Sequence, residues 1–344
     1  MCNIAGYIGS RKASPILIEL LRKQEGLDGG YYSGIATMEH GQIRYEKVVG
    51  NVATLLQTTD CLALPGTIGI AHTRTPGDTG REWAHPFVCE NDGMIETAFL
   101  LNGSIGCFYD REKAYEKIAE ELIAEGYLMK SIVPSNGKSL SLSNGNRVHL
   151  SEVLCKYITR KIRQGKDTIE AMKETYIEMP KEIVGLLISV TEENSITWAR
   201  MNCPIFAGYA SHGIYIASTP QSFPNDVLKI ETLPAMSVGR VYQNEITYKE
   251  FCEKPGTVAV YDENTVECAR IIIEKELSYG RKTFPDLREK IVHLFKEADM
   301  TTAGELTYKI LFDIQKQEKL KEEIVYLPGV YDGLYAPVTL MSLI

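Results

Sequence analysis

The sequence predicts an α+β fold, because strand-like and helix-like stretches occupy separate blocks of the chain. Short runs of branched and aromatic residues between turn formers dominate residues 3–103 and return at 183–218. Between these blocks, residues 111–127 and 150–175 repeat apolar side chains with helical spacing. After Val241 the chain becomes charged and rich in helix formers, which predicts a mainly helical C-terminal extension.

The length of 344 residues allows one large core and a smaller unit, since single cores stop growing near about 250–300 residues. Apolar residues make up 44% of the chain and charged residues 24%, which is typical of a folded, soluble protein. Because the pattern changes after Val241, we expect one domain at residues 1–240 and a second at 241–344.

The first strand is expected at residues 3–9, where small and branched side chains end in a glycine turn. Ser14 and Pro15 predict the start of the next helix, with the serine as its N-cap and the proline in its first turn. Turn formers at 133–147 predict an exposed loop between the central helices. The other expected strands cover residues 34–37, 42–49, 66–71, 98–101, 183–190, 195–200 and 213–218.

The charge balance argues against nucleic acid as a partner. Lysines and arginines number 37 against 45 aspartates and glutamates, so the formal charge is -8, the wrong sign for binding phosphate backbones. No apolar run approaches the roughly 20 residues of a membrane-spanning helix, and the N-terminus lacks the pattern of a secretory signal. We therefore expect a cytoplasmic protein that binds neither nucleic acid nor a membrane.

The eight cysteines occur singly, without a C-x-x-C pair and without histidines at metal-ligand spacing. This pattern predicts neither a disulfide framework nor a metal site, and we expect no cofactor. Five of the cysteines are expected to be buried, unreactive thiols, namely Cys61, Cys89, Cys107, Cys155 and Cys203.

Cys2 differs from these cysteines, because removal of Met1 would leave a thiol and a free α-amine on the same residue. An α-amine titrates near about pH 8, so a useful fraction is neutral near pH 7 and can accept the thiol proton. The thiolate could then attack an amide carbonyl. A cysteine at position 2 is a weak signal by itself, so the interpretation depends on further motifs.

Further motifs follow Cys2 along the chain, and together they resemble the class II glutamine amidotransferases, most closely the glutaminase domain of glutamine-fructose-6-phosphate aminotransferase. They cover about residues 1–240, and several short motifs in one order are more specific than any single motif. The matching segments are residues 1–8 (MCNIAGYI), 33–36 (SGIA), 50–52 (GNV), 69–74 (GIAHTR), 84–86 (AHP), 102–103 (NG), 151–153 (SEV) and 216–218 (IAS).

The resemblance implies a four-layer αββα N-terminal-nucleophile hydrolase sandwich, in which two antiparallel sheets are stacked between helical layers. It also implies that Cys2 attacks the side-chain amide of glutamine, forms a thioester and releases ammonia. By position, Arg74 and Thr75 would bind the substrate, with the guanidinium of Arg74 paired with the substrate α-carboxylate. The side-chain amide of Asn102 and the backbone N–H of Gly103 would form the oxyanion hole.

The chain also departs from the family pattern. The arginine expected in the segment before Ser33 is missing, and the loop after Arg74 is shorter and different in sequence. Leu150 stands where the family has the aspartate that binds the substrate ammonium. The acidic residues that could replace it are Asp28, Asp78 and Glu82, and an amide without an ammonium group is the alternative. We interpret His72 and His85 as hydrogen-bonded structural residues rather than a catalytic pair.

The C-terminal residues 281–344 resemble a small helix-turn-helix or winged-helix unit. They contain nine lysines and arginines against ten aspartates and glutamates, so no basic stripe supports DNA binding. Docking to a partner or formation of a homo-oligomer is the better interpretation. The residues after Val241 are also too few for a synthase module, so any use of ammonia would need a separate synthase subunit.

Two hypotheses follow from these observations. In the first, the chain is a glutaminase-like amide hydrolase that acts on glutamine or a related carboxylate-bearing amide. In the second, it is a catalytically degenerate binding or regulatory module, which the altered loop and Leu150 favour. Retention of Met1 would block the α-amine and support the second hypothesis.

Overall fold

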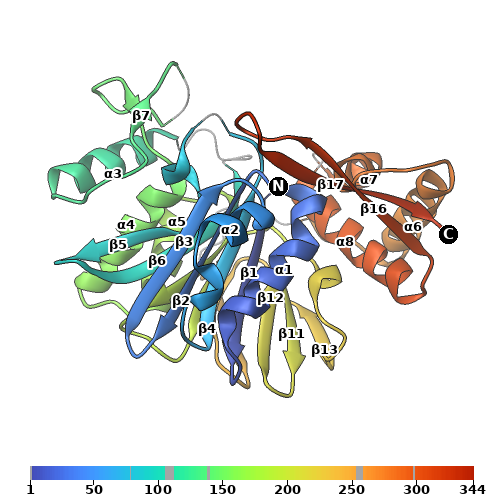
Figure 1. Cartoon of the computed structure of the whole chain (residues 1–344), viewed down its shortest axis with the longest axis horizontal. Helices are drawn as coiled ribbons and strands as arrows, with labels where there is room; N and C mark the ends of the chain where they lie inside the picture. Colours follow the sequence, from blue (N-terminus) through green and yellow to red (C-terminus); the bar gives the residue numbers. More distant parts are fainter. Residues whose placement is uncertain (1, 78, 105–111, 138–139, 253–258, 297–298) are drawn as a thin grey trace.

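The computed structural model describes residues 2–344 except 78, 105–111, 138–139, 253–258 and 297–298. It is a mixed α/β structure whose described part contains two large antiparallel sheets (Figure 1). The seven-stranded sheet has the order β13-β11-β12-β1-β4-β2-β3, and the six-stranded sheet has the order β15-β14-β10-β9-β6-β5.

The strands of the seven-stranded sheet are β1 (Asn3–Gly9), β2 (Tyr32–Glu39), β3 (Gln42–Val49), β4 (Ile68–Arg74), β11 (Phe206–Ala210), β12 (Gly213–Ala217) and β13 (Lys229–Thr232). Those of the six-stranded sheet are β5 (Phe87–Asn91), β6 (Met94–Ser104), β9 (Glu182–Ser189), β10 (Ile196–Arg200), β14 (Ser237–Val241) and β15 (Ile246–Glu250). The helices are α1 (Ala13–Asp28), α2 (Val52–Thr58), α3 (Glu112–Ala124), α4 (Leu150–Arg163), α5 (Thr168–Glu178), α6 (Glu263–Ser278), α7 (Phe284–Ile291) and α8 (Met300–Lys316). Two small hairpins pair β7 (Val133–Pro134) with β8 (Asn146–Arg147), and β16 (Leu320–Pro328) with β17 (Tyr335–Leu343).

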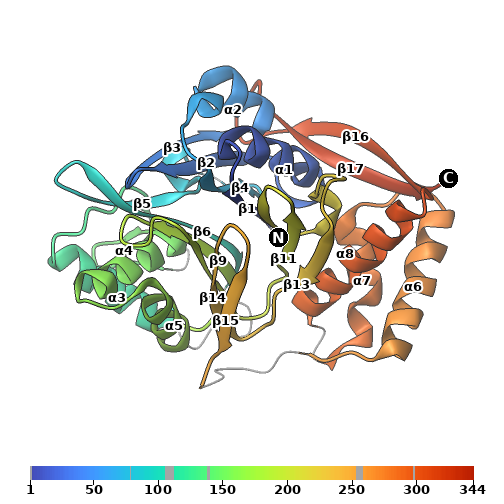
Figure 2. The ribbon, with the colours of Figure 1, turned by 90° about the horizontal axis from the view of Figure 1, so that it is seen from below.

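Three apolar cores hold these elements together. The first lies between the two sheets and includes Ile4 and Ile70 from one sheet and Leu186 and Trp198 from the other. The second joins the outer face of the seven-stranded sheet to α1 and to the C-terminal helices, and the third joins the six-stranded sheet to α3, α4 and α5. Figure 2 shows α1 and α2 on one side of the sheets and α3, α4 and α5 on the opposite side.

The seven strands expected after residues 3–9 all coincide with observed strands. The structure adds β5, β11, β13, β14 and β15, which the sequence did not indicate because they are short and contain few contiguous branched residues. The helical stretch expected at 150–175 is two helices, since the chain turns at Gly165 with a φ of 93° and α5 begins at the N-cap Asp167.

The N-cap expected at Ser14 is wrong. Helix α1 begins at Ala13 after the N-cap residue Lys12, and no side chain caps it. The Ser14 hydroxyl instead donates to the carbonyl oxygens of Leu62 and Leu64, at 3.1 and 3.0 Å, so it connects α1 to the neighbouring loop.

The six-stranded sheet extends beyond residue 240, where the first domain was expected to end. Strand β15 pairs with β14 in the register Ser237↔Glu250 to Val241↔Ile246. A division between two units would therefore fall after Glu250, in the segment that leads to α6.

The C-terminal elements follow the order α6, α7, α8 and the hairpin β16–β17. Just before α7, Lys282 forms an isolated antiparallel β-bridge with Met341 of β17. In both views they lie together at one side of the sheets, close to α1 and the N-terminus (Figures 1 and 2). Thr339 of β17 approaches Gly26 of α1 so closely that a Cβ atom at position 26 would collide with it. The unit is therefore packed directly against the first helix of the chain.

An ion pair between Arg200 of β10 and Glu305 of α8 connects the C-terminal unit to the six-stranded sheet. Both side chains are buried, and Glu305 also accepts hydrogen bonds from Lys309 at 2.7 Å and Tyr261 at 3.0 Å. Burial alone would raise the pKa of the Glu305 carboxyl, but the charges of Arg200 and Lys309 together hold it at about 2. The pair thus remains ionised over the whole physiological range.

We predict that Glu305→Ala lowers the free energy of unfolding by about 3–5 kcal/mol, because it leaves the buried Arg200 without its carboxylate. Urea denaturation measures this loss. Since the folded pKa lies below that of an unfolded glutamate, about 4.3, the contribution of Glu305 is complete above that value and is lost as the pH falls toward 2. The control is Glu323→Ala, which removes an exposed pair with Arg281 and should cost less than about 1 kcal/mol. Equal losses of unfolding free energy in the two variants would contradict a special contribution of the buried Arg200–Glu305 pair.

Candidate functional site

Cys2 lies immediately before β1, in the middle of the seven-stranded sheet. Its side chain is half-buried, and its Sγ atom is 3.6 Å from the Oγ1 atom of Thr75. Strand β1 pairs with β4 in the register Asn3↔Thr73, so the beginning of β1 lies beside the end of β4. This register brings three of the predicted site residues together where these two central strands begin and end, namely Cys2, Arg74 and Thr75.

The guanidinium of Arg74 is enclosed by aromatic rings and by the loop that follows it. It lies 4.8 Å from the ring centre of Tyr32 and 5.8 Å from that of Trp83. A Cβ atom at Gly77 would lie 2.8 Å from Arg74 Nη1, so the glycine allows the loop to approach the guanidinium. Arg74 Nη1 is buried and has no hydrogen-bond partner among the described residues. A buried guanidinium N–H without an acceptor is suited to an anionic ligand.

Asn102 and Gly103 lie near the end of β6, in the other sheet. The ring of His72 on β4 bridges the two sheets, because its Nε2 donates to the carbonyl oxygen of Leu101 at 3.0 Å. Asn102, the next residue, is buried, and its Oδ1 atom has no hydrogen-bond partner in the described part of the chain. Gly103 has a φ of 131°, a left-handed conformation that favours glycine. The end of β6 is thus tied to β4 two residues before Arg74.

His72 and His85 stack on each other, with ring centres 3.9 Å apart. Burial, together with the charge of Arg74, lowers the pKa of His72 to about 3, and burial lowers that of His85 well below its usual value. His85 Nε2 lies 2.9 Å from the hydroxyl oxygen of Ser151, at the start of α4. Both rings are therefore neutral near pH 7, and His72 connects the two sheets while His85 contacts α4, which is the geometry of structural histidines.

The acidic residues considered as replacements for an ammonium-binding aspartate are used elsewhere where the structure describes them. Glu82 pairs with the buried Lys47 at 3.1 Å, and Asp28 lies 3.9 Å from Arg288 of α7. Asp78 lies outside the described residues. Leu150 is the first residue of α4 and packs against the core beneath that helix.

Sequence reasoning missed part of the surroundings of Arg74. Trp83 was not singled out. The guanidinium of Arg74 nevertheless lies near its ring, and the guanidinium of Arg147 lies 4.5 Å from the ring centre. Tyr32 is a second such residue, because its hydroxyl donates to the carbonyl oxygen of Thr79 at 2.7 Å and so fixes the loop after Arg74. Trp83 follows Arg74 closely in the sequence, which could have indicated its role, whereas Tyr32 comes beside Arg74 only through the pairing of β2 with β4.

The other predictions concern groups outside this site. Cys61, Cys89, Cys155 and Cys203 are buried, and burial raises the pKa of Cys155 to about 12. Cys107 lies outside the described residues. Among the residues that the structure describes, no helix is long and apolar enough to cross a membrane.

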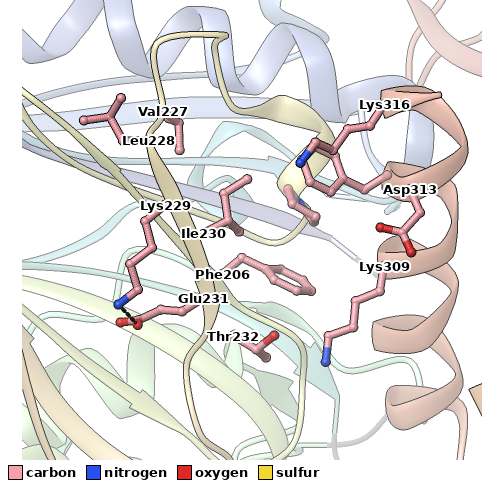
Figure 3. Close-up of a pocket in the computed structure, with 12 residues that line it drawn as sticks. Phe206, Val227, Leu228, Lys229, Ile230, Glu231, Thr232, Lys309, Asp313 and Lys316 are labelled. Atoms are coloured by element: carbon pink, nitrogen blue, oxygen red, sulfur yellow. Dashed lines mark hydrogen bonds and ion pairs between the residues drawn. The ribbon is translucent and has the colours of Figure 1, made fainter. Parts of the chain in front are cut away.

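A separate groove of about 330 Å³ lies between the edge strand β13 and helix α8 (Figure 3). Lys229 pairs with Glu231 at 2.7 Å, and Asp313 pairs with Arg270 at 2.6 Å, so much of the charge around the groove is paired within the protein. None of the predicted site residues lines it. We therefore place the candidate site at the start of β1 rather than at this groove.

Comparison with known proteins gives the following relatives. No protein-family model matches the chain. The glutamine–fructose-6-phosphate aminotransferase (isomerizing) of Pyrococcus horikoshii is 26% identical over 230 residues, which cover 65% of this chain and 33% of the relative. The Bartonella henselae enzyme of the same name is 28% identical over 222 residues, which cover 63% of this chain and 32% of the relative. The chain thus spans about a third of the length of these curated relatives.

The fold is similar to that of the glutamine phosphoribosylpyrophosphate amidotransferase from B. subtilis, solved with ADP and GMP. The TM-score is 0.59 at 16% identity, and the match covers 94% of this chain and 66% of that one. A structure of the allosteric regulatory enzyme of purine biosynthesis has the same TM-score at 15% identity. Both likenesses concern the fold. Together with the sequence relatives, they confirm that this chain resembles the class II glutamine amidotransferases, as the motifs at Cys2, His72 and Asn102 predict.

Proposed function

We propose that the chain is a glutaminase-like amide hydrolase whose nucleophile is the thiol of Cys2, released at the N-terminus by removal of Met1. The observation that carries this proposal is the buried, unpartnered Nη1 of Arg74 on the strand next to Cys2. A carboxylate bound there would complete the hydrogen bonding of Arg74 and hold an attached amide near the thiol. Thr75, whose hydroxyl lies 3.6 Å from the Cys2 Sγ, belongs to the same binding surface.

In the proposed reaction, Cys2 Sγ bonds to the amide carbon while the thiol proton passes to the α-amine. The resulting oxyanion accepts hydrogen bonds from the side-chain N–H of Asn102 and the backbone N–H of Gly103. The carbon–nitrogen bond then breaks, and the α-ammonium returns the proton to the leaving nitrogen, giving ammonia and a thioester. Water then attacks the thioester carbon and gives a proton to the α-amine. The carbon–sulfur bond breaks, the sulfur takes up that proton, and the carboxylic acid is released.

The finer architecture is part of the same proposal. We infer a four-layer αββα sandwich with a helical, winged-helix-like C-terminal unit, and the three apolar cores and the order of α6, α7, α8, β16 and β17 support it. Because the relatives named above are aminotransferases, we propose that ammonia is passed to a synthase subunit or released.

The substrate class follows from the charges around the site. Arg74 offers a guanidinium for a carboxylate, whereas Asp28 and Glu82 are engaged with Arg288 and Lys47. A buried ammonium without an acceptor costs about 1–3 kcal/mol or more. We therefore propose that amides with a carboxylate but without an α-ammonium, such as glutaramate, are better substrates than glutamine.

The alternative function is a binding or regulatory module that keeps the fold without catalysis. It is favoured by the engagement of Asp28 and Glu82 with Arg288 and Lys47, and retention of Met1 would support it, whereas a processed N-terminus is compatible with both functions. Intact-mass measurement of the purified chain distinguishes a processed from a retained N-terminus. A processed N-terminus is required for the hydrolase, and a stable partner recovered with the chain from its source cell would support the module.

We predict that the purified protein releases ammonia from glutaramate, glutamine or asparagine, and that Cys2→Ala abolishes this release. The reason is that alanine removes the group that forms the bond to the amide carbon. Cys252→Ala is the matched control, because Cys252 is an exposed cysteine outside the site, and it should keep the wild-type rate. No ammonia from any of the three amides would eliminate the hydrolase proposal.

We predict that Arg74→Lys lowers kcat/KM for glutaramate by about 10- to 100-fold, mainly through a higher KM. Lysine keeps the charge but loses the planar pair of N–H donors, and hydrogen bonds to charged groups contribute about 1.5–3 kcal/mol. Steady-state ammonia release measures the change. Arg81→Lys, in the same region but exposed at 51% of its side chain, should leave kcat/KM within about twofold. An unchanged KM in Arg74→Lys would remove Arg74 from the binding site.

A further inference from the structure

We propose that Tyr308 of the C-terminal helix α8 is a positioning residue for the thiol of Cys2, and that it acts through Asn3. The part of this inference that concerns kinetics rests on the proposed hydrolase function. The part that concerns the position of the thiol does not, because it follows from the contacts of Asn3.

Asn3 follows Cys2 directly, and its side chain is fully buried. Its Nδ2 donates to the carbonyl oxygens of Gln24 and Asp28, both at 2.9 Å, so it is bound to the last turns of α1. Its Oδ1 accepts a hydrogen bond from the hydroxyl of Tyr308 at 3.1 Å. Both donor positions and the acceptor of this amide are therefore used, and the acceptor is satisfied from the C-terminal unit.

Tyr308 is held firmly in its own unit. It is buried, and its ring stacks on that of Phe284 in α7, with ring centres 4.1 Å apart and planes inclined by 11°. Glu305, three residues earlier and on the same side of α8, pairs with Arg200 of the six-stranded sheet. Arg288 of α7 lies 3.9 Å from Asp28, at the end of α1. These contacts connect α8 to the six-stranded sheet and to α7, and α7 to the end of α1.

Residue 2 depends on this arrangement because the ladder of β1 begins only at Asn3. Asn3 pairs with Thr73, whose hydroxyl accepts from the backbone N–H of Gly30 at 2.7 Å. A shift of Asn3 would therefore move Cys2 relative to Arg74 and Thr75. Displacement of a reacting group by about 1 Å can lower a rate by about 10²-fold.

The burial of α8 supports a role within the chain. Every residue from 301 to 308 is buried, including polar side chains such as Thr301, Thr302 and Thr307. A helix that reads a DNA groove must present one face to solvent. Residues 301–308 of α8 present none, so the described contacts of this stretch are with the protein itself.

The test compares Tyr308→Phe with Tyr261→Phe. Both variants remove one tyrosine hydroxyl from the same unit, but Tyr261 donates to Glu305 and does not contact Asn3. Two quantities are measured in each variant. The first is the alkylation rate of Cys2 by iodoacetamide, read by mass spectrometry of the N-terminal peptide, and the second is kcat and KM for ammonia release.

We expect Tyr308→Phe to change the alkylation rate of Cys2 at least threefold and to lower kcat about tenfold, with KM within twofold of wild type. Tyr261→Phe should leave all three values within twofold. The Asn3→Ala variant provides a double-mutant cycle, because Tyr308→Phe should have no further effect once the acceptor is gone. Additive effects, or equal effects of the two tyrosine variants, would overturn the proposal.

The experiment remains decisive if the wild-type protein is inactive or if Tyr308→Phe does not fold. If wild-type protein releases no ammonia, the hydrolase proposal fails, but the alkylation rates still decide the role of Tyr308. If Tyr308→Phe does not fold, Phe284→Leu replaces it, since this variant keeps the hydroxyl and removes the ring on which Tyr308 stacks. An unchanged Cys2 alkylation rate in that variant would count against the inference.

Discussion

The structure depends on the constraint that the chain begins in the centre of a sheet. Strand β1 pairs with β12 on one side and with β4 on the other, so its backbone is ordered from Asn3 onward. The segments that form these neighbours are far apart in the sequence, at residues 68–74 and 213–217. The partly exposed thiol at position 2 thus occupies a defined place at the end of a rigid element, as a reacting group requires.

The second sheet completes the site across the core. His72 connects β4 to β6 and remains neutral because it is buried next to the charge of Arg74. Burial is the main cause of its low pKa, and the charge of Arg74 lowers the pKa further. His85 stacks on His72 and is hydrogen-bonded to Ser151, so it links the His72 ring to α4.

Most of the framework could be predicted from the sequence, because strands such as β1, β4 and β9 are runs of branched residues between turn formers. The motif residues Cys2, Arg74 and Asn102 could be named because short motifs retain their order along the chain. Contacts between distant segments could not be predicted. The hydroxyl of Ser14 bonds to a loop rather than capping its helix, and nothing in the local sequence near Tyr308 indicates a bond to Asn3. Such pairings depend on tertiary packing, which local patterns do not record.

The packing of Thr339 against Gly26 and of the C-terminal helices against α1 has a practical consequence for anyone who shortens this protein. Cutting the chain after the six-stranded sheet would remove the apolar side chains that pack over α1 and would expose the end of the helix that anchors Asn3. A fragment with every residue of the amidotransferase motifs would then be prone to aggregate. The last quarter of the chain therefore covers a surface of the first domain that would otherwise be exposed to solvent.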